Sequence, residues 1–275
     1  MRITFLAVLL VWLVSPVFLR AHGDVDEHIA ALTEQIQKDR GNARLYLKRG
    51  ELHRDRHHWT AADADYIRAA QIDPSLVIVE LARARLLFEA GRPSRALLRV
   101  DGYLGGQPGD AEARMLRARI LARLSRGVEA AREFTQAIEQ IAEPQPEHYI
   151  ERAQALVRSG PQHRDEALRG LDEGMQRFGP LVTLELPAID LELKSKNYDA
   201  ALRRLEAIAA QSPRQETWLA RRGEILLQAG RPAEARFAFQ SALEAVESLP
   251  SGRRWTPATV KLESRVRQTL RGDAL

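Results

Sequence analysis

Small and apolar residues follow a helical spacing through most of the chain. Residues 43–56 and 60–71 each place such side chains three and four positions apart, which puts them on one face of a helix. Thr60 is expected to cap the second of these helices. Asp73 and Pro74 are expected to end it, because the residue before a proline disfavours helical backbone. The pattern therefore predicts two consecutive helices joined by a short turn.

This helix pair returns at an interval of 34 residues. Small residues recur at that interval in three series: Gly50, Ala84 and Ala118; Ala62, Ala96 and Ala130; and Ala167, Ala201 and Ala235. Glycine followed by Arg-Pro at residues 91–93 and 230–232 predicts the turn inside a pair, because glycine adopts left-handed backbone and proline begins a helix. An internal period of this length is typical of a solenoid of stacked helix pairs.

The interval and the residues at its fixed positions resemble the tetratricopeptide repeat family, whose repeat has 34 residues. The packing positions of that pattern are occupied by Gly50, Ala62, Tyr66, Pro74, Ala84, Ala96, Pro108, Ala118, Ala130, Phe134, Ala153, Ala167, Ala201, Gly223, Ala235 and Phe239. Six repeats follow, at residues 43–76, 77–110, 111–145, 146–181, 182–215 and 216–250. The fifth departs from the pattern, with Ile189 at the small-residue position and Pro187 inside its first helix.

The resemblance implies an all-α fold, a right-handed superhelical solenoid of about six antiparallel helix pairs. Residues 24–42 and 251–275 are expected to be capping helices at its two ends, because a terminal repeat otherwise exposes a core face. Trp255 is expected to pin the last helix to the sixth repeat.

Residues 1–23 have the pattern of a secretory signal peptide. A positively charged start and a long apolar run precede Ala21 and Gly23, small residues at the positions that a signal peptidase reads. The alternative is an uncleaved membrane anchor, since the apolar run reaches the short limit for a span. We expect cleavage, and hence a chain exported to the bacterial periplasm or secreted.

Opposite charges alternate along the chain, with 41 Lys and Arg against 37 Asp and Glu. A nucleic-acid binder presents a concentrated basic face, so nucleic acid is not an expected partner. The chain has no cysteine, which excludes disulfides and thiolate-ligated metals.

No motif for catalysis is present: the sequence has neither a GxSxG elbow nor a GKS or GKT phosphate loop. The acid pairs Asp63/Asp65 and Asp190/Glu192 are expected on solvated helix surfaces, because residues two apart do not share a helix face. We therefore expect neither enzymatic activity nor a cofactor.

His53 and His57 are the candidates for a metal site. They are four residues apart, which places both imidazoles on one face, a spacing that two-histidine metal sites use. Asp55 lies off that face, so no third ligand joins them. The alternative is that His53 packs in place of a core tyrosine and His57 fills the turn.

The resemblance also implies a binding surface. In this family the first helix of each repeat lines a concave groove that binds peptide segments. The corresponding side chains are Leu47, Glu51, Arg54, Leu81, Arg85, Phe88, Met115, Arg119, Arg123, Ile150, Gln154 and Arg158. Four of these residues, Arg85, Arg119, Arg123 and Arg158, would favour an acidic segment or a C-terminal carboxylate, because arginine pairs bidentately with carboxylates. The alternative is that these arginines only solvate the groove or pair with Glu51, Glu89 and Glu112.

These observations predict a non-catalytic protein–protein interaction scaffold of the bacterial cell envelope. The alternative is an accessory subunit of an envelope enzyme complex, with a metal at the histidines. The identity of the partner and the oligomeric state stay open at the level of the sequence.

Overall fold

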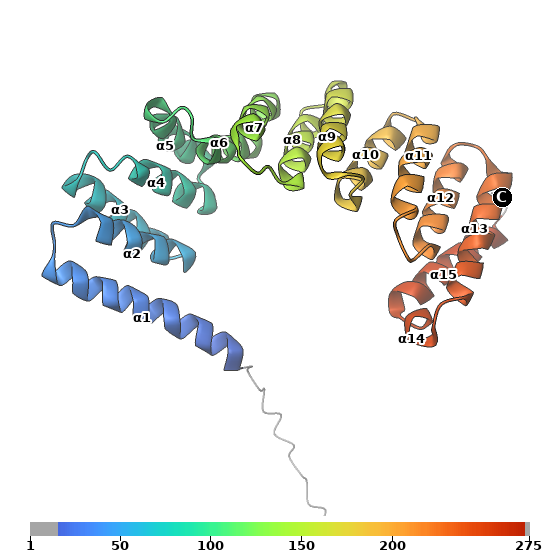
Figure 1. Ribbon diagram of the computed structural model, residues 1–275, viewed down its shortest axis with the longest axis horizontal. Helices are drawn as coiled ribbons and strands as arrows, with labels where there is room; N and C mark the ends of the chain where they lie inside the picture. Colours follow the sequence, from blue (N-terminus) through green and yellow to red (C-terminus); the bar gives the residue numbers. More distant parts are fainter. Residues whose placement is uncertain (1–15, 273–275) are drawn as a thin grey trace, which may run out of the picture. The chain divides into compact units, whose positions relative to one another are not determined.

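The computed structural model describes the backbone of residues 16–272 and the side chains of residues 25–272, so most of the predicted signal peptide lies outside the described residues. Every regular element in the described part is a helix, which confirms the all-α prediction. The α-helices, labelled in Figure 1, are α1 (Pro16–Lys38), α2 (Ala43–Asp55), α3 (Trp59–Ile72), α4 (Ile78–Glu89), α5 (Pro93–Gly106), α6 (Ala111–Arg123), α7 (Gly127–Gln140), α8 (Pro146–Arg158), α9 (Arg164–Phe178), α10 (Val182–Lys194), α11 (Tyr198–Ala209), α12 (Glu216–Gln228), α13 (Pro232–Glu247), α14 (Ser251–Arg254) and α15 (Pro257–Arg271). A single 3-10 turn, Pro161–His163, precedes α9. Among the described helices, none has the length and apolarity needed to cross a membrane.

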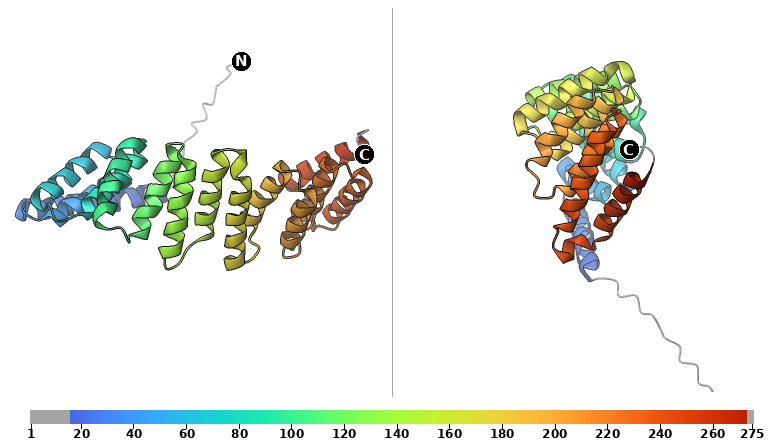
Figure 2. Two further views of the ribbon diagram at one scale, coloured as in Figure 1. Left: turned by 90° about the horizontal axis from the view of Figure 1, so that it is seen from above. Right: turned by 90° about the vertical axis from the view of Figure 1, so that its right-hand side faces the viewer.

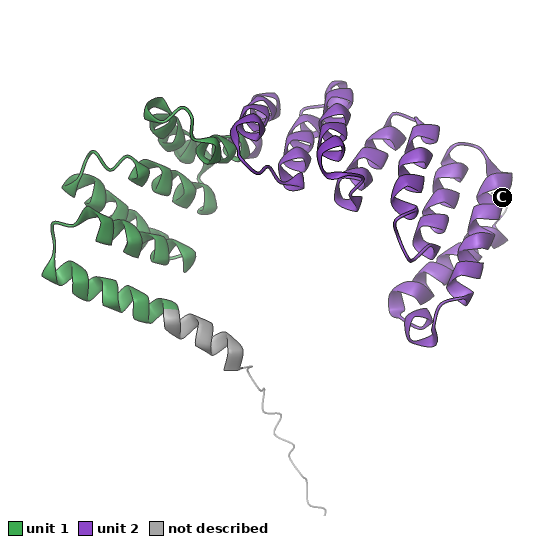
Figure 3. Ribbon diagram, viewed as in Figure 1, with its two compact units in different colours: residues 1–120 green, residues 121–275 purple. Residues whose placement is uncertain are grey.

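The helices form two compact units, residues 1–120 and residues 121–275, which Figure 3 colours separately. Within each unit, helices that follow one another in the sequence lie side by side with opposite directions, as Figures 1 and 2 show. Unit 1 contains the pairs α2–α3 and α4–α5, and unit 2 contains α8–α9, α10–α11 and α12–α13. In unit 1, α1 packs on α2, and in unit 2, α15 packs on α13.

Small side chains sit where the helices of a pair touch. The alanines that recur along the second helices are all fully buried: Ala62, Ala96, Ala130, Ala167, Ala201 and Ala235. In the first helices, a Cβ atom added to Gly50 would lie 2.6 Å from the ring of Tyr66, and one added to Gly223 would lie 2.6 Å from the ring of Phe239. The small residue of one helix therefore makes room for the aromatic ring of the next.

The turn inside a pair has left-handed backbone at the same position along the chain. Gly91 and Gly230 have φ of 72° there, as predicted, and Pro93 and Pro232 begin the following helices. In other pairs the position is held by residues with a side chain: His57, Ser125 and Lys196, with φ of 58°, 61° and 60°. Left-handed backbone strains every residue except glycine, so these three turns are strained relative to the glycine turns.

An arginine in the first helix joins most pairs to the helix before them. Arg49 donates to the Thr33 hydroxyl at 3.0 Å. The equivalent hydrogen bonds run from Arg83 to Asp63 at 2.9 Å, from Arg117 to Asp101 at 2.7 Å and from Arg152 to Thr135 at 3.4 Å. Arg222 forms an ion pair with Glu206 at 3.9 Å in the same position. These arginines also recur near the period of 34, and this signal was missing from the sequence-based analysis. They add polar contacts between successive pairs.

Two local predictions are wrong. Thr60 does not cap α3, because that helix begins one residue earlier at Trp59, after His58, whose side chain makes no capping bond. Trp255 does not pin the last helix, since it is 67% exposed; Val266 packs α15 against the core instead.

The helix α10 continues through Pro187, because Leu184, Ala188 and Leu191 on its buried face anchor both sides of the proline.

We expect Ala96→Arg or Ala130→Arg to unfold its unit, because each change forces a guanidinium into a fully buried helix contact. The expected loss exceeds about 3 kcal/mol in the free energy of unfolding. Thermal melts followed by circular dichroism measure it, with Ala64→Arg at an exposed position of α3 as the matched control. An unchanged melting midpoint for the two buried variants would show that the packing described here is wrong.

We expect Lys196→Gly to stabilise unit 2 by about 1 kcal/mol, because glycine adopts the left-handed backbone of this turn without strain. Urea denaturation measures the change, with Gly230→Ala as the opposite variant in the same unit. That variant is expected to lose a similar amount, and a stabilising effect of both changes would contradict the strain argument.

Candidate partner-binding site

An apolar pocket of about 200 Å³ lies between α8 and α10, wholly within unit 2. Its apolar walls are Ile150, Ala153, Val157, Leu171, Pro187 and Leu191. Its polar side chains are Gln154, Arg158, Asp190 and Lys194. Three residues predicted for the groove, Ile150, Gln154 and Arg158, are therefore brought together here.

The local fold places these side chains. Ile150, Gln154 and Arg158 are four residues apart on α8, so they share one face of that helix. Tyr149 and Leu156 on its other side are buried, which fixes the rotation of α8. On α10, the pocket residues are likewise three and four positions apart. The face of α8 and the face of α10 that do not pack into the core therefore meet at the pocket.

The charges of the pocket are unbalanced. Neither Arg158 nor Lys194 forms a side-chain ion pair with any residue that the structure describes. Asp190, in contrast, lies 3.3 Å from the guanidinium of Arg221 on α12. The pocket therefore combines apolar walls with two uncompensated cations, which suits an apolar side chain beside an anionic group.

A row of ion pairs continues from the pocket across unit 2. Arg221 contacts Asp190 at 3.3 Å and Glu224 at 3.1 Å. Glu224 in turn contacts Arg265 of α15 at 3.3 Å. We call Asp190, Arg221, Glu224 and Arg265 the charge row. Its charges compensate one another, in contrast to Arg158 and Lys194.

The predicted groove residues of unit 1 form a different arrangement. Arg54 contacts Glu51 at 2.7 Å on its own helix and Glu89 of α4 at 3.5 Å, so its charge is compensated within the chain. Leu47 packs partly against the core of unit 1. Arg85 and Phe88 on α4 are half-buried.

The prediction is wrong for Leu81 and Met115, which are 2% and 0% exposed. Both occupy the position of Ile150 in their helices, at the edge of the apolar stripe. In their helices the side chain at this position is buried and no partner reaches it, whereas Ile150 is half-buried and lines the pocket. On the same helix as Met115, Arg119 is half-buried and Arg123 is exposed.

The histidine pair does not form. Helix α2 ends at Asp55, and His57 follows in left-handed backbone with its ring 4.8 Å from that of Trp59. The ring of His53 lies 6.0 Å from that of His58 instead, and burial lowers the pKa of His53. The metal candidate is therefore wrong in its geometry, and the described residues contain no group of three side chains suited to a metal ion.

Some of the acidic residues that were predicted to lie on solvated helix surfaces are buried and paired with arginines. Asp65 is buried and accepts two hydrogen bonds from Arg49, at 2.8 and 2.7 Å. Glu185 and Glu192 are buried on α10 and lie 3.4 and 3.5 Å from Arg204. Burial raises the pKa of Glu185, although Arg204 opposes this. These carboxylates are therefore paired with arginines inside the helix packing.

The pocket residues of α10 were missed from the sequence, because Pro187 obscured the register of the fifth repeat. A signal was available: Asp190 and Lys194 follow Gln154 and Arg158 by one common interval of 36 residues. The same interval relates Ile150 to Leu186, a neighbour of the pocket that is partly exposed.

The comparisons with known proteins agree with this architecture. A tetratricopeptide repeat model matches residues 81–146, and a tetratricopeptide repeat-like domain model matches residues 162–263. The chain belongs to the tetratricopeptide repeat family. No curated protein matches it.

Solved structures show the same fold. A tetratricopeptide repeat protein from Parabacteroides merdae is 18% identical, with 90% of this chain and 94% of that chain covered and a TM-score of 0.55. The pilF protein of Pseudomonas aeruginosa is 14% identical, with 85% and 99% covered and a TM-score of 0.52. At these identities the likeness shows a tetratricopeptide repeat fold and nothing finer.

We expect Arg204→Leu to destabilise unit 2 by about 3–5 kcal/mol at neutral pH, because it leaves two buried carboxylates without their cation. Without Arg204, the pKa of Glu185, which burial already raises, rises further in the folded state. The folded state then binds more protons than the unfolded state above about pH 4.3, so stability falls as the pH rises.

Urea denaturation of the Arg204→Leu variant between pH 4.5 and 8 measures the loss in the free energy of unfolding and the direction in which that loss changes with pH. Arg203→Leu is the matched control, because Arg203 is the exposed neighbour of Arg204 and forms no side-chain ion pair among the described residues. A loss that is the same for both variants, or that grows toward acid pH, contradicts the role assigned to Arg204.

Proposed function

We propose that this tetratricopeptide repeat chain is a scaffold that binds an acidic peptide segment, internal or C-terminal, in the pocket between α8 and α10. A role in protein–protein interaction follows from the fold itself. The observation that carries the finer proposal is the combination of an apolar pocket with two cations, Arg158 and Lys194, that have no ion-pair partner in the described chain.

The magnitudes assign different roles to the two parts of the pocket. Burial of one leucine-sized side chain contributes about 1.5–3 kcal/mol. An exposed ion pair contributes only about 0.2–1 kcal/mol. The apolar walls therefore supply most of the affinity, and the cations select acidic over basic segments and speed the encounter.

A scaffold without catalysis of its own fits the same residues. Asp190 is the one carboxylate that lines the pocket among the described residues, and it is engaged by Arg221. A general base needs a carboxylate that is free to accept a proton from a bound substrate. Members of this family also serve generally as non-catalytic scaffolds.

We further propose that the chain works in the bacterial cell envelope after export. The support is the signal-like pattern of residues 1–23. Intact-mass measurement of the chain from a periplasmic fraction is expected to show loss of these residues. Retention of the whole segment in a membrane fraction would replace this proposal by an anchored form.

The binding proposal is tested by fluorescence anisotropy with a labelled peptide that carries one leucine between glutamates. We expect saturable binding, which is lost when alanine replaces the leucine or when lysines replace the glutamates. Arg158→Glu combined with Lys194→Glu is expected to weaken binding at least about tenfold, equivalent to about 1.4 kcal/mol.

Arg169→Glu is the matched control, because Arg169 is exposed on α9 but does not line the pocket. It is expected to leave the affinity nearly unchanged. Equal binding by the double variant and the unaltered chain would rule out this pocket as the site.

A further inference from the structure

The last turn of unit 2 presents an exposed tryptophan beside an open hollow. Trp255 lies between α14 and α15 and is 67% exposed, and Val260 on α15 is 42% exposed. The hollow has a volume of about 670 Å³. It is lined by Trp255, Pro257, Val260, Lys261, Ser264, Arg265 and Gln268, and we call it the α15 hollow.

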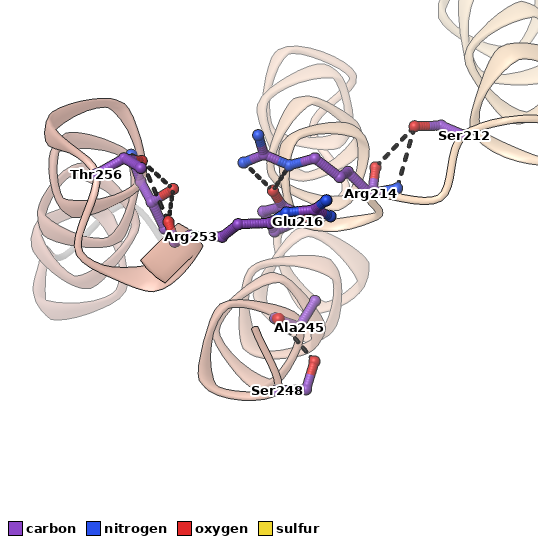
Figure 4. Close-up of polar contacts among 8 residues, drawn as sticks. Ser212, Arg214, Glu216, Ala245, Ser248, Arg253 and Thr256 are labelled. Carbon is purple, nitrogen blue, oxygen red and sulfur yellow. Dashed lines mark hydrogen bonds and ion pairs between the residues drawn. The ribbon is translucent and has the colours of Figure 1, made fainter. Parts of the chain in front are cut away.

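The backbone around Trp255 is held on both sides. The carbonyl oxygen of Arg253 accepts hydrogen bonds from the hydroxyls of Thr256 at 3.2 Å and Thr259 at 3.0 Å. The Thr256 hydroxyl also caps α15 by accepting a bond from the backbone N–H of Thr259. Figure 4 shows these bonds at the turn. The turn thus fixes the position from which Trp255 projects.

The same turn approaches the start of α12. Glu216 there is buried, and Arg214 donates to it through Nε at 2.6 Å. In Figure 4 the Arg253 side chain extends from the turn toward this pair. Helix α15, which follows the turn, packs on both α12 and α13 of unit 2.

The exposure of Trp255 is not the result of a loose helix. Val266 of α15 is buried, and Leu262 and Leu270 pack against the core of unit 2. The hollow lies on the face that this packing leaves open. A large aromatic ring kept in water by a rigid turn forgoes the stabilisation that burial would give, and such a ring is a typical binding anchor.

The charges around the hollow are positive. Lys261 forms no side-chain ion pair with the described residues, and the guanidinium of Arg254 lies 5.4 Å from the centre of the Trp255 ring. Arg265, the other cation of the hollow, is compensated by Glu224. The uncompensated charge favours an anionic partner.

We propose that the α15 hollow is a second binding site, which receives a bulky apolar side chain from an acidic segment of a protein partner. The hollow beside Trp255 admits a side chain, and Pro257 and Val260 supply further apolar lining. The cations around it pair with the acidic groups that flank the inserted side chain.

The site is separate from the pocket between α8 and α10, and its evidence is independent of that pocket. The charge row nevertheless runs from one to the other, since Asp190 lines the pocket and Arg265 lines the hollow. Because its charges are compensated, the charge row contributes little net attraction for a ligand. The uncompensated cations of the pocket and of the hollow therefore act separately.

The test uses the full chain labelled with 5-fluorotryptophan and observed by fluorine NMR. The probe is a peptide with one phenylalanine between glutamates, and its counterpart carries serine in place of phenylalanine. We expect the probe to shift the Trp255 resonance in a saturable way, with Trp59 and Trp218 as internal references. The serine counterpart is expected to leave the resonance in place.

Lys261→Glu is expected to raise the dissociation constant measured at Trp255 about tenfold. Arg271→Glu, on the same helix but outside the hollow, is the matched control. The Arg158→Glu and Lys194→Glu variant is expected to keep the Trp255 shift, so failure of the other pocket is distinguished from failure here.

Two results would overturn the proposal. One is a Trp255 resonance that no acidic peptide moves. The other is a resonance that moves with phosphatidylglycerol vesicles and not with the peptides, which would assign this face to a membrane surface.

Discussion

The close approach of helices at fully buried small residues is the constraint on which the rest of this structure depends. Ala62 and Ala201 have no exposed surface, and Gly50 leaves just enough room for the ring of Tyr66. Helices held at such contact distance cannot rotate without a clash, because protein interiors are close-packed. The face that each first helix turns away from the core is therefore determined by the residues that face inward.

The candidate site follows from that constraint. Once Tyr149 and Leu156 are buried, α8 presents residues four apart to its neighbour, and α10 presents its own set opposite them. Charge then distinguishes this place from the buried helix contacts. Arginines such as Arg49 and Arg204 form ion pairs with buried carboxylates, whereas Arg158 and Lys194 form none with the described residues. A cation that stabilises packing is unavailable to a ligand, and an uncompensated one at an apolar pocket is available.

The sequence predicted the helices and the buried small and aromatic residues such as Ala62 and Tyr66, because both depend on local spacing and on residue size. Pro74 and Pro108, predicted as packing residues with them, are exposed instead, because they lie in the turns that follow α3 and α5. The sequence-based prediction was wrong where the burial or pairing of a side chain depends on the neighbouring helices. Met115 is buried, whereas Ile150, at the same position of its own helix, is half-buried at the pocket. The end of α2 at Asp55 separated His57 from His53, and burial turned Glu192 from an expected surface acid into an ion-paired one. Alternation of charge in the sequence does not reveal which charges remain uncompensated after folding.

The most direct measurement of the outward face of α8 is cysteine accessibility, which the absence of native cysteine makes clean. Single cysteines would replace Ala153, Gln154, Leu156 and Arg158 in turn, and their rates of maleimide labelling would be compared in the folded chain. The account predicts fast labelling at 154 and 158, slow labelling at 153 and 156, and protection of the fast pair by a bound acidic peptide. Fast labelling at 153 and 156, or no protection at 154 and 158, would contradict the packing and the site together.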